Sequence, residues 1–143
     1  MKKLAAGNRW LPHPDAEKYT MDGKEIQETA IKVASALPSA ELCYPFGPEY
    51  EVFKVRGKMF ALMAQVRGER IVNLKCEPEN SLLQRAIYDS IHPAYHMNKR
   101  HWISIYPGGQ ITEGLVQQLV EESYDLVVAG LPKRRRPMEK RET

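Results

Sequence analysis

Residues 44–76 constrain the fold more than any other part of the chain. They read YPFGPEYEVFKVRGKMFALMAQVRGERIVNLKC, a run rich in β-branched and aromatic residues that three glycines interrupt beside charged or turn-forming neighbours. Short apolar runs separated by glycine-containing turns are typical of antiparallel strands joined by hairpins. The pattern therefore predicts a meander of three strands, over residues 50–56, 58–66 and 70–76.

The middle strand of this meander has a distinct pattern. In MFALMAQV, residues 59–66, apolar side chains occupy both alternating sets of positions. A strand with one solvated face alternates apolar and polar residues, whereas a strand buried on both faces does not. We therefore expect this strand to lie inside the sheet, with both faces covered by a helix, a partner or the tail.

Periodic apolar residues predict a first helix over residues 22–37. Asp22 followed by Glu25 matches a capping box, in which the two side chains accept hydrogen bonds from otherwise unpaired backbone N–H groups. Apolar residues then recur at helical spacing from Ile26 to Leu37, and Pro38 ends the run.

Two further helices are predicted in the second half of the chain. Pro78 suits the first turn of a helix, because its missing N–H is not needed there. We expect the apolar stripe of this helix to be buried: Leu82, Leu83, Ala86 and Ile87. Thr112 can cap the last helix, and the sequence GLP at residues 130–132 is a helix stop signal.

A strand over HWISIY, residues 101–106, lies between the second and third helices. The predicted order is helix, three strands, helix, one or two strands, helix. This order favours an α+β fold, a two-layer sandwich in which helices pack on an antiparallel sheet. Trp102 is expected to anchor the core between the strand and the helices, with its indole N–H bonded to a carbonyl group.

A chain of 143 residues fits one domain. We interpret residues 1–20 as an N-terminal arm, residues 21–132 as the α+β domain and residues 133–143 as a basic tail. The last twelve residues hold six cations and two anions, whereas the other 131 hold 15 cations and 16 anions. The net charge of +3 therefore belongs to the tail, which weakens a whole-protein electrostatic case for nucleic acid.

The apolar runs are too short to span a membrane, and the N-terminal residues lack the apolar core of a secretory signal. We therefore expect a cytoplasmic protein in a reducing compartment. Cys43 and Cys76 should then be free thiols, buried and inert in their apolar surroundings.

Five blocks of the sequence, in this order, resemble the MmcQ/YjbR family of small bacterial proteins. The blocks are YPFG (44–47), EVFKVRGKMFA (51–61), NLKC (73–76), YHMNKRHW (95–102) and SYDLVV (123–128). The resemblance covers about residues 40–132 and extends, at most, to the helix at 22–37. The arm and the basic tail lie outside it.

The resemblance implies an α+β fold described as CyaY-like and similar to secretion-chaperone architecture. It also implies DNA binding, because the fold of the family looks like a double-wing nucleic-acid module. No catalytic mechanism accompanies the family. Fold similarity alone does not establish function, which depends on the particular residues of a site.

Three of the four histidines lie in the segment IHPAYHMNKRHW, residues 91–102. His92, His96 and His101 could ligate a divalent metal, since neutral imidazole is a common ligand. However, Pro93 follows His92, no cysteine or carboxylate completes the set, and cations lie close to His96 and His101. We therefore expect no metal site and no cofactor.

Catalytic motifs are missing from the sequence. It has no G-x-S-x-G, no Walker loop and no G-x-G-x-x-G after a strand. Ser104 lies between two isoleucines in a predicted strand, and Cys76 has no evident base beside it. We predict no catalytic residue. An enzyme of unknown substrate stays open as an alternative through His96, whose side chain can titrate near neutral pH.

The residues that fit nucleic acid lie in the meander and in the loop YHMNKRHW. The loop offers planar groups for stacking, an amide for adenine and cations for phosphate, and a two-stranded ribbon can lie against a nucleic-acid backbone. The predicted contacts are Lys54, Arg56, Lys58, Lys75, Tyr95, His96, Asn98, Lys99 and Arg100. Each also has a structural explanation, since cations protect exposed sheet edges and an asparagine can bond its own loop.

The first interpretation is therefore a non-catalytic bacterial protein that binds DNA. The alternative is a protein- or peptide-binding adaptor, including a homodimer, that uses the apolar strand and the sheet edge. The salt dependence of binding distinguishes the two interpretations, because phosphate binding weakens steeply with added ions and the burial of apolar surface does not.

Overall fold

The computed structural model describes residues 4–5, 8–10, 21–94 and 97–138 of the 143-residue chain. Its main body contains, in chain order, α1 (Gly23–Ser35), β3 (Ala40–Cys43), β4 (Val52–Val55), β5 (Lys58–Val66), β6 (Glu69–Lys75), α2 (Pro78–Ile87), β7 (Ile91–Pro93), β8 (Trp102–Ile105), α3 (Glu113–Ala129) and a 3-10 turn (Lys133–Arg135). Two short strands, β1 (Leu4–Ala5) and β2 (Asn8–Trp10), pair only with each other.

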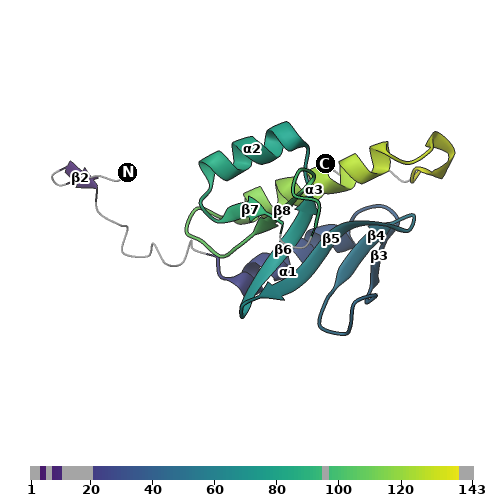
Figure 1. Ribbon diagram of the computed structural model, residues 1–143, viewed down its shortest axis with the longest axis horizontal. Coiled ribbons are helices and arrows are strands. Elements are labelled where there is room, and N and C mark those ends of the chain that lie inside the picture. Colours follow the sequence, from purple (N-terminus) through teal and green to yellow (C-terminus); the bar gives the residue numbers. More distant parts are fainter. Residues whose placement is uncertain (1–3, 6–7, 11–20, 95–96, 139–143) are drawn as a thin grey trace.

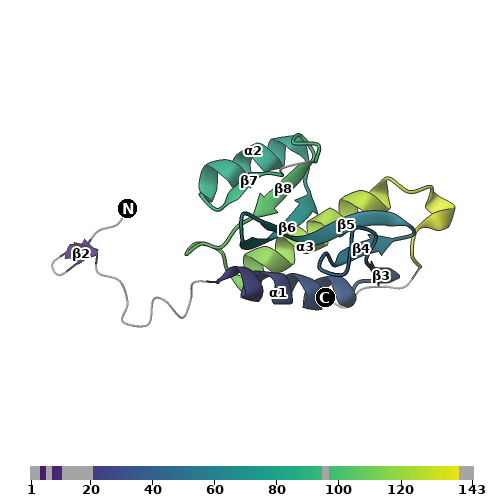
Figure 2. The ribbon, with the colours of Figure 1, turned by 60° about the horizontal axis from the view of Figure 1, so that its bottom comes forward.

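Six strands form one antiparallel sheet in the order β3-β4-β5-β6-β8-β7. α1 and α3 pack against each other and cover one face of this sheet, behind the strands in Figure 1. α2 lies beside β7 and β8 (Figure 2). The predicted α+β class is confirmed. β3 was not predicted, because residues 40–43 lie between the proposed helix and the proposed meander.

The helix starts follow the predicted capping chemistry. Asp22 Oδ1 accepts a hydrogen bond from the N–H of Glu25 at 2.8 Å, and Glu25 Oε1 accepts one from the N–H of Asp22 at 3.0 Å. Thr112 Oγ1 likewise accepts from the N–H of Leu115 at 3.1 Å. These bonds satisfy backbone donors that the first turn of each helix leaves unpaired.

Two-residue turns join the three central strands. Arg56-Gly57 connects β4 to β5 with φ values of 51° and 81°, and Arg67-Gly68 connects β5 to β6 with 53° and 85°. Positive φ at both central residues matches the type I′ turn, whose twist suits antiparallel hairpins. Each turn therefore places an arginine at a loop tip, at opposite ends of β5.

A bulge in β5 decides which side chains face the helices. Phe53 pairs with Ala61 but Lys54 pairs with Met59, so Phe60 is an extra residue between them. Phe60 therefore joins Ala61 in the buried core, where its ring packs edge-on against Tyr124 with centroids 5.3 Å apart. Beyond the bulge, Met59 turns to the opposite face of the sheet.

Ser123 of α3 ties the helix layer to two strands. Its fully buried hydroxyl donates to the carbonyl oxygen of Phe60 at 2.6 Å and accepts from the N–H of Lys75 at 2.9 Å. The bulge and the end of β6 are thus held by one side chain. The buried core extends from Met21 to Leu131, and the boundaries proposed at residues 20 and 132 stay predictions.

The predicted burial of the apolar stripe on α2 is wrong. Leu82, Leu83 and Ile87 are 63%, 54% and 49% exposed, and Ala86 is exposed as well. The inner face is polar instead, with Ser81 and Gln84 buried. The reason is the position of α2, which lies beside β7 rather than over the centre of the sheet, so the sheet core is already filled by α1 and α3.

The predicted place of Trp102 in the core is also wrong. Ile103 and Ile105 are fully buried in the core cluster that includes α1 and α3. Alternation along β8 then turns Trp102 and Ser104 to the opposite face, where Trp102 is half-buried and pairs with Lys75 of β6. The core contribution of this strand therefore comes from its isoleucines.

Candidate nucleic-acid interface

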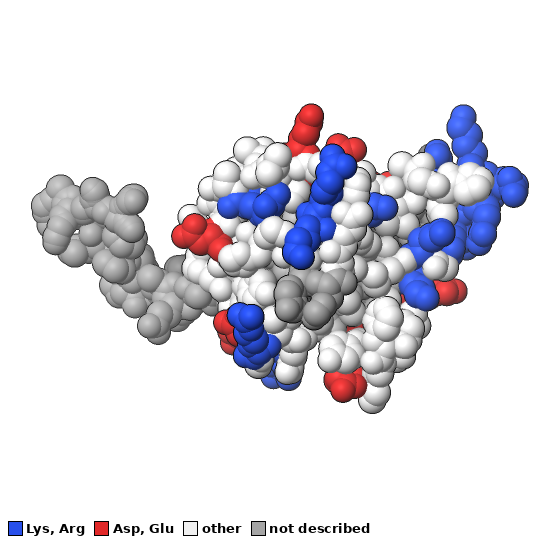
Figure 3. All heavy atoms as spheres, viewed as in Figure 1, with Lys and Arg blue, Asp and Glu red and all other residues white. Residues whose placement is uncertain are grey.

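Cations from four segments lie at one end of the six-stranded sheet. The β4–β5 turn is at this end, and antiparallel pairing brings the last residue of β6 and the loop before β8 to the same end. We call this set the basic end: Arg56, Lys58, Lys75, Lys99, Arg100, Lys133, Arg134 and Arg135. Figure 3 shows Lys and Arg side chains in the upper middle and at the right-hand end of the face opposite α1 and α3, with a smaller group at the lower left.

The basic segment after α3 is attached to the β4–β5 turn. Arg56 Nε donates to the carbonyl oxygen of Arg135 at 2.9 Å. The neighbouring Arg136 folds back onto α3, donating to the carbonyl oxygens of Ala129 at 2.9 Å and Leu131 at 3.1 Å. Residues 133–135 are therefore held beside the sheet by bonds on both sides of the segment.

The loop before β8 has a fixed geometry. Asn98 Oδ1 accepts from the N–H of Arg100 at 3.0 Å, and the Asn98 carbonyl oxygen accepts from the backbone N–H of Trp102 at 3.0 Å. The His101 carbonyl oxygen accepts from the N–H of Cys76, at the end of β6, at 2.8 Å. Lys99 and Arg100 are exposed at the tip of this loop. Their backbone is already ordered, so less conformational entropy is lost when they meet a ligand.

The opposite end of the sheet has mixed charge. Arg67 lies in its turn, and Glu69 and Arg70 begin β6. Lys24 of α1 forms an ion pair with Glu28 at 3.9 Å. Anions lie near the basic end as well, since Glu77 and Glu122 border the cavity beside Cys76, but the eight cations of the basic end outnumber them.

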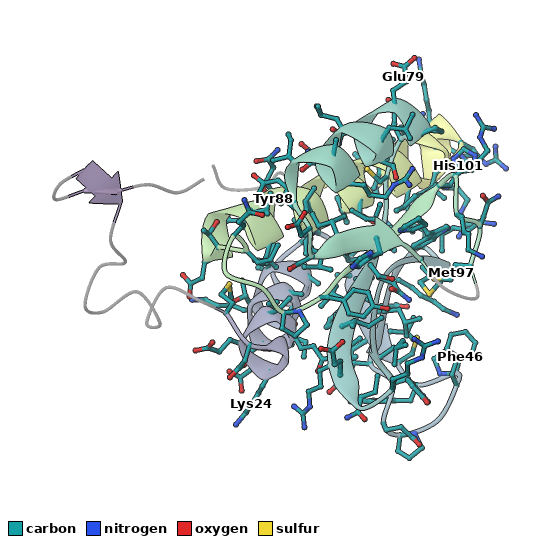
Figure 4. All side chains as sticks on the ribbon, turned by 60° about the vertical axis from the view of Figure 1, so that its left-hand side comes forward. Lys24, Phe46, Glu79, Tyr88, Met97 and His101 are labelled. Carbon is teal, nitrogen blue, oxygen red and sulfur yellow. The ribbon has the colours of Figure 1, made fainter. Side chains whose placement is uncertain are left out.

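An apolar pocket of about 400 Å³ lies on the face opposite α1 and α3. We call it the face pocket. Strand residues, including Leu62, Ala64 and Asn73, form its floor, and Phe46, Tyr50 and Met97 come from two loops. Figure 4 shows Phe46 and Met97 on the same side of the sheet. Because Phe46 is 60% exposed, its ring is presented to solvent at the rim.

A buried amide lies at the floor of the face pocket. Asn73 is only 4% exposed, and its Oδ1 accepts a hydrogen bond from the hydroxyl of the fully buried Ser104. Asn73 Nδ2 donates to Met97 Sδ at 3.4 Å. A thioether is a weak acceptor, so a stronger acceptor in the pocket could take its place.

The structure brings five of the predicted contact residues to the basic end: Arg56, Lys58, Lys75, Lys99 and Arg100. Lys54 lies inward on β4, paired with Met59 of the face pocket. Asn98 uses its side chain to shape its own loop. Tyr95 and His96 lie outside the described residues.

Neither the face pocket nor the attachment of the segment after α3 is evident from the sequence pattern. The pocket depends on Phe46 and Tyr50 from one loop meeting Met97 from another, almost fifty residues later in the chain. A signal was present in YPFGPEY, where aromatic residues alternate with turn formers, since loop aromatics are often functional.

Within the described ranges, no three His, Cys, Asp or Glu side chains come together as metal ligands. His92 is exposed and packs edge-on against Tyr106, with ring centroids 4.9 Å apart. His101 is half-buried and supplies the carbonyl bond to Cys76 described above.

Both cysteines are free thiols. Cys76 borders a second cavity of about 380 Å³ with Glu122 and Asp125 of α3. Burial, followed by the negative charge of Glu122, raises the pKa of the Cys76 thiol above its ordinary value. A raised pKa keeps the thiol protonated and makes it a poor nucleophile. The Cys76 thiol is therefore not activated by its surroundings.

Fold and site together define an α+β domain with helices on one sheet face, an apolar pocket on the other face and clustered cations at one end of the sheet. The family model named YjbR matches residues 35–126. The chain belongs to the YjbR family. No helix in the described part of the chain is long and apolar enough to cross a membrane.

Relatives and solved structures support this assignment. The uncharacterized protein YbdF of Escherichia coli O157:H7 is 54% identical over 114 residues, which are 80% of this chain and 93% of that protein. The uncharacterized protein YjbR of Escherichia coli K12 is 30% identical over 108 residues, 76% and 92% of the two chains. A crystal structure from Deinococcus radiodurans, with the domain named DUF419, aligns with a TM-score of 0.65 at 33% identity and covers 73% of this chain and 80% of that one.

A second crystal structure, of a Pseudomonas syringae protein, aligns with a TM-score of 0.56 at 28% identity, covering 74% of this chain and 98% of that one. These relatives establish the family and the fold.

Proposed function

We propose that the protein binds nucleic acid through the basic end, without catalysing a reaction. The observation that carries this proposal is the hydrogen bond from Arg56 Nε to the Arg135 carbonyl oxygen. It joins cations from the β4–β5 turn and from the segment after α3 into one surface. Lys99 and Arg100 extend that surface from a loop whose backbone is held by its own hydrogen bonds.

The distribution of charge supports a polyanionic ligand more strongly than the net charge does. Outside the last twelve residues, cations and anions nearly balance. A local excess at one end of a sheet nevertheless creates a positive potential that attracts phosphate and steers its approach. Lys and Arg side chains supply most phosphate contacts in such complexes, and these contacts set position and affinity rather than sequence preference.

The experiment is a fluorescence-anisotropy titration with labelled duplex and single-stranded DNA at several salt concentrations. The variant Lys99→Gln/Arg100→Gln removes two charges from the basic end. Arg67→Gln/Arg70→Gln removes the same charge from the opposite end and is the matched control. Loss of two phosphate contacts should lower the slope of log affinity against log salt by about 1.4 to 1.8, whereas the control keeps the wild-type slope.

Two results would contradict the proposal. One is binding whose affinity does not change with salt, and the other is an equal loss of slope in both variants. Deleting residues 133–143 should weaken binding on every sequence alike, because phosphate contacts carry no base preference. We further infer a cytoplasmic location, no bound cofactor, and a division into an arm, a domain and a basic tail.

The exposed stripe on α2 favours a second candidate function, the binding of a protein partner, including a second copy of this chain. Leu82, Leu83 and Ile87 lie on one side of a helix whose inner face is polar. Light scattering after size exclusion should report a monomer for Leu82→Ser/Ile87→Ser if wild type is a dimer through this stripe. Leu42→Ser, on β3, is the control with a similarly exposed leucine.

A further inference from the structure

We propose that the nucleic acid is single-stranded and that the face pocket takes one of its unpaired bases. This inference rests on the proposed function and adds the class of ligand to it. The face pocket extends along β5, with Met59, Asn73 and Met97 toward the basic end and Gln65 and Val66 toward the opposite end. A ligand that fills this pocket and reaches the basic end must join a flat, largely apolar group to a chain of negative charges. A single strand of DNA or RNA has this chemistry.

The walls of the face pocket suit a planar ring. Phe46 and Tyr50 come from the loop between β3 and β4, and the flexible Met97 faces them from the loop before β8. Bases stack on aromatic side chains without strong sequence preference, because every base has a π face. The thioether of methionine also contacts ring edges favourably. A volume of about 400 Å³ lies within the range of small-ligand pockets.

The floor of the face pocket supplies one oriented polar group. Ser104 holds Asn73 Oδ1, which fixes the direction of the Asn73 amide. Asn73 Nδ2 then points at Met97 Sδ, 3.4 Å away. A base carbonyl oxygen or ring nitrogen is a better acceptor than a thioether, so it can replace Met97 as the partner of this donor. The arrangement accepts a base edge as well as a base face.

The surrounding charges fit the phosphates of the same strand. Lys54 pairs with Met59 at one side of the pocket, and Lys75 lies two residues beyond Asn73, about 7 Å along the same face. Lys99 and Arg100 follow Met97 within three residues. Trp102 pairs with Lys75 on this face and offers a second ring to a neighbouring base. Bases inside a duplex are stacked and paired, so only an unpaired base can enter the face pocket.

The test compares labelled twelve-nucleotide single strands, as DNA and as RNA, with the matching duplex by anisotropy. Phe46→Ala should weaken single-strand binding about tenfold, the scale of one lost base stack, and leave duplex binding unchanged. Leu42→Ala is the matched control, because Leu42 is 45% exposed but lies outside the face pocket. It should change neither affinity.

A second measurement places a base at the site. In wild type, a strand of abasic positions alone should bind about tenfold more weakly than a strand with one central base flanked by abasic positions, whereas Phe46→Ala should bind both alike. In a Trp10→Phe background, Trp102 is the remaining tryptophan, and single strands should quench its fluorescence.

The outcomes separate this inference from the proposed function. Equal affinity for single strand and duplex, or unchanged single-strand binding in Phe46→Ala, would overturn the base pocket and leave salt-dependent binding at the basic end in place. Absence of binding to every strand would overturn both. Weaker single-strand binding in Phe46→Ala with no response to abasic positions would also overturn the inference, because the ring would then contact the backbone.

Discussion

Arg56 donates its Nε hydrogen to the carbonyl oxygen of Arg135, a residue 79 positions later in the chain. The bond leaves the other two nitrogens of the guanidinium group for a ligand, since arginine carries five N–H donors. Arg56 therefore has two roles at the basic end, holding the segment after α3 and presenting its own charge.

The first prediction concerns this pair of roles. Arg56→Gln and deletion of residues 133–143 should each weaken nucleic-acid binding. The double variant should lose less binding free energy than the two single changes added together. The reason is that each change removes the same attachment, and neighbouring groups of this kind couple by about 0.5–1 kcal/mol. A double-mutant cycle measured by anisotropy checks it. Strict additivity would show that the segment is positioned without Arg56.

The second prediction concerns the backbone of the β4–β5 turn. Gly57 has φ of +81°, and a Cβ added there would meet nothing within 4 Å. Gly57→Ala should still lower the free energy of unfolding by about 1–2 kcal/mol, because the left-handed conformation itself disfavours a side chain. Gly114→Ala in α3, where a Cβ also meets nothing within 4 Å, is the control and should be neutral or stabilising. Urea denaturation of both variants is the measurement.

The third prediction follows from the two faces of β8. Trp102→Ala should cost about 1–2 kcal/mol, less than the about 3–5 kcal/mol typical of a fully buried aromatic side chain. Ile103→Ala should cost more than Trp102→Ala, because Ile103 is fully buried in the core cluster. Thermal melts rank the two variants, and a larger loss for Trp102→Ala would contradict the assignment of faces.

The fourth prediction concerns Cys76, whose pKa is raised first by burial and then by the charge of Glu122. In a Cys43→Ser background, alkylation of Cys76 by iodoacetamide should be slow at about pH 8, because the reactive thiolate is scarce. Glu122→Gln should lower the pKa and shift the pH profile of alkylation downward. Glu113→Gln, at the start of α3, is the control. An unchanged profile in Glu122→Gln would show that the charge of Glu122 does not contribute to the raised pKa.

The raised pKa of Cys76 also makes the free energy of unfolding depend on pH. The unfolded thiol ionises at lower pH than the folded thiol of Cys76. The unfolded state therefore loses its proton first, and the free energy of unfolding falls as pH rises above the ordinary thiol pKa. Cys76→Ser should reduce this fall.

Local features of the fold could be predicted from the sequence. The capping box of Asp22 and Glu25 depends on residues three positions apart, and the Arg-Gly turns depend on two adjacent residues. Such interactions depend only on residues that are close in the sequence, so the sequence pattern is enough to predict them. The central position of β5 followed for the same reason, from the apolar residues on both of its faces.

Features that depend on distant segments could not be predicted. The apolar stripe of α2 indicated burial, but the sheet core was already filled by α1 and α3, and only polar groups of α2 face inward. The core position expected for Trp102 rested on its strand and its neighbours Ile103 and Ile105, although alternation with Ile103 places it on the other face. The face pocket and the attachment of Arg135 require contacts that no local pattern encodes.

The hydrogen bond at Ser123 allows the packing of α3 on the sheet to be measured by hydrogen exchange. The Lys75 amide hydrogen is bonded to the Ser123 hydroxyl rather than to a neighbouring strand. Exchange of that hydrogen for deuterium therefore requires α3 to separate from the sheet, while the strands can stay paired. Amides of β5 and β6 that bond across strands exchange only when the sheet opens. The protection of one amide at the basic end thus measures how firmly the helix layer is docked behind it.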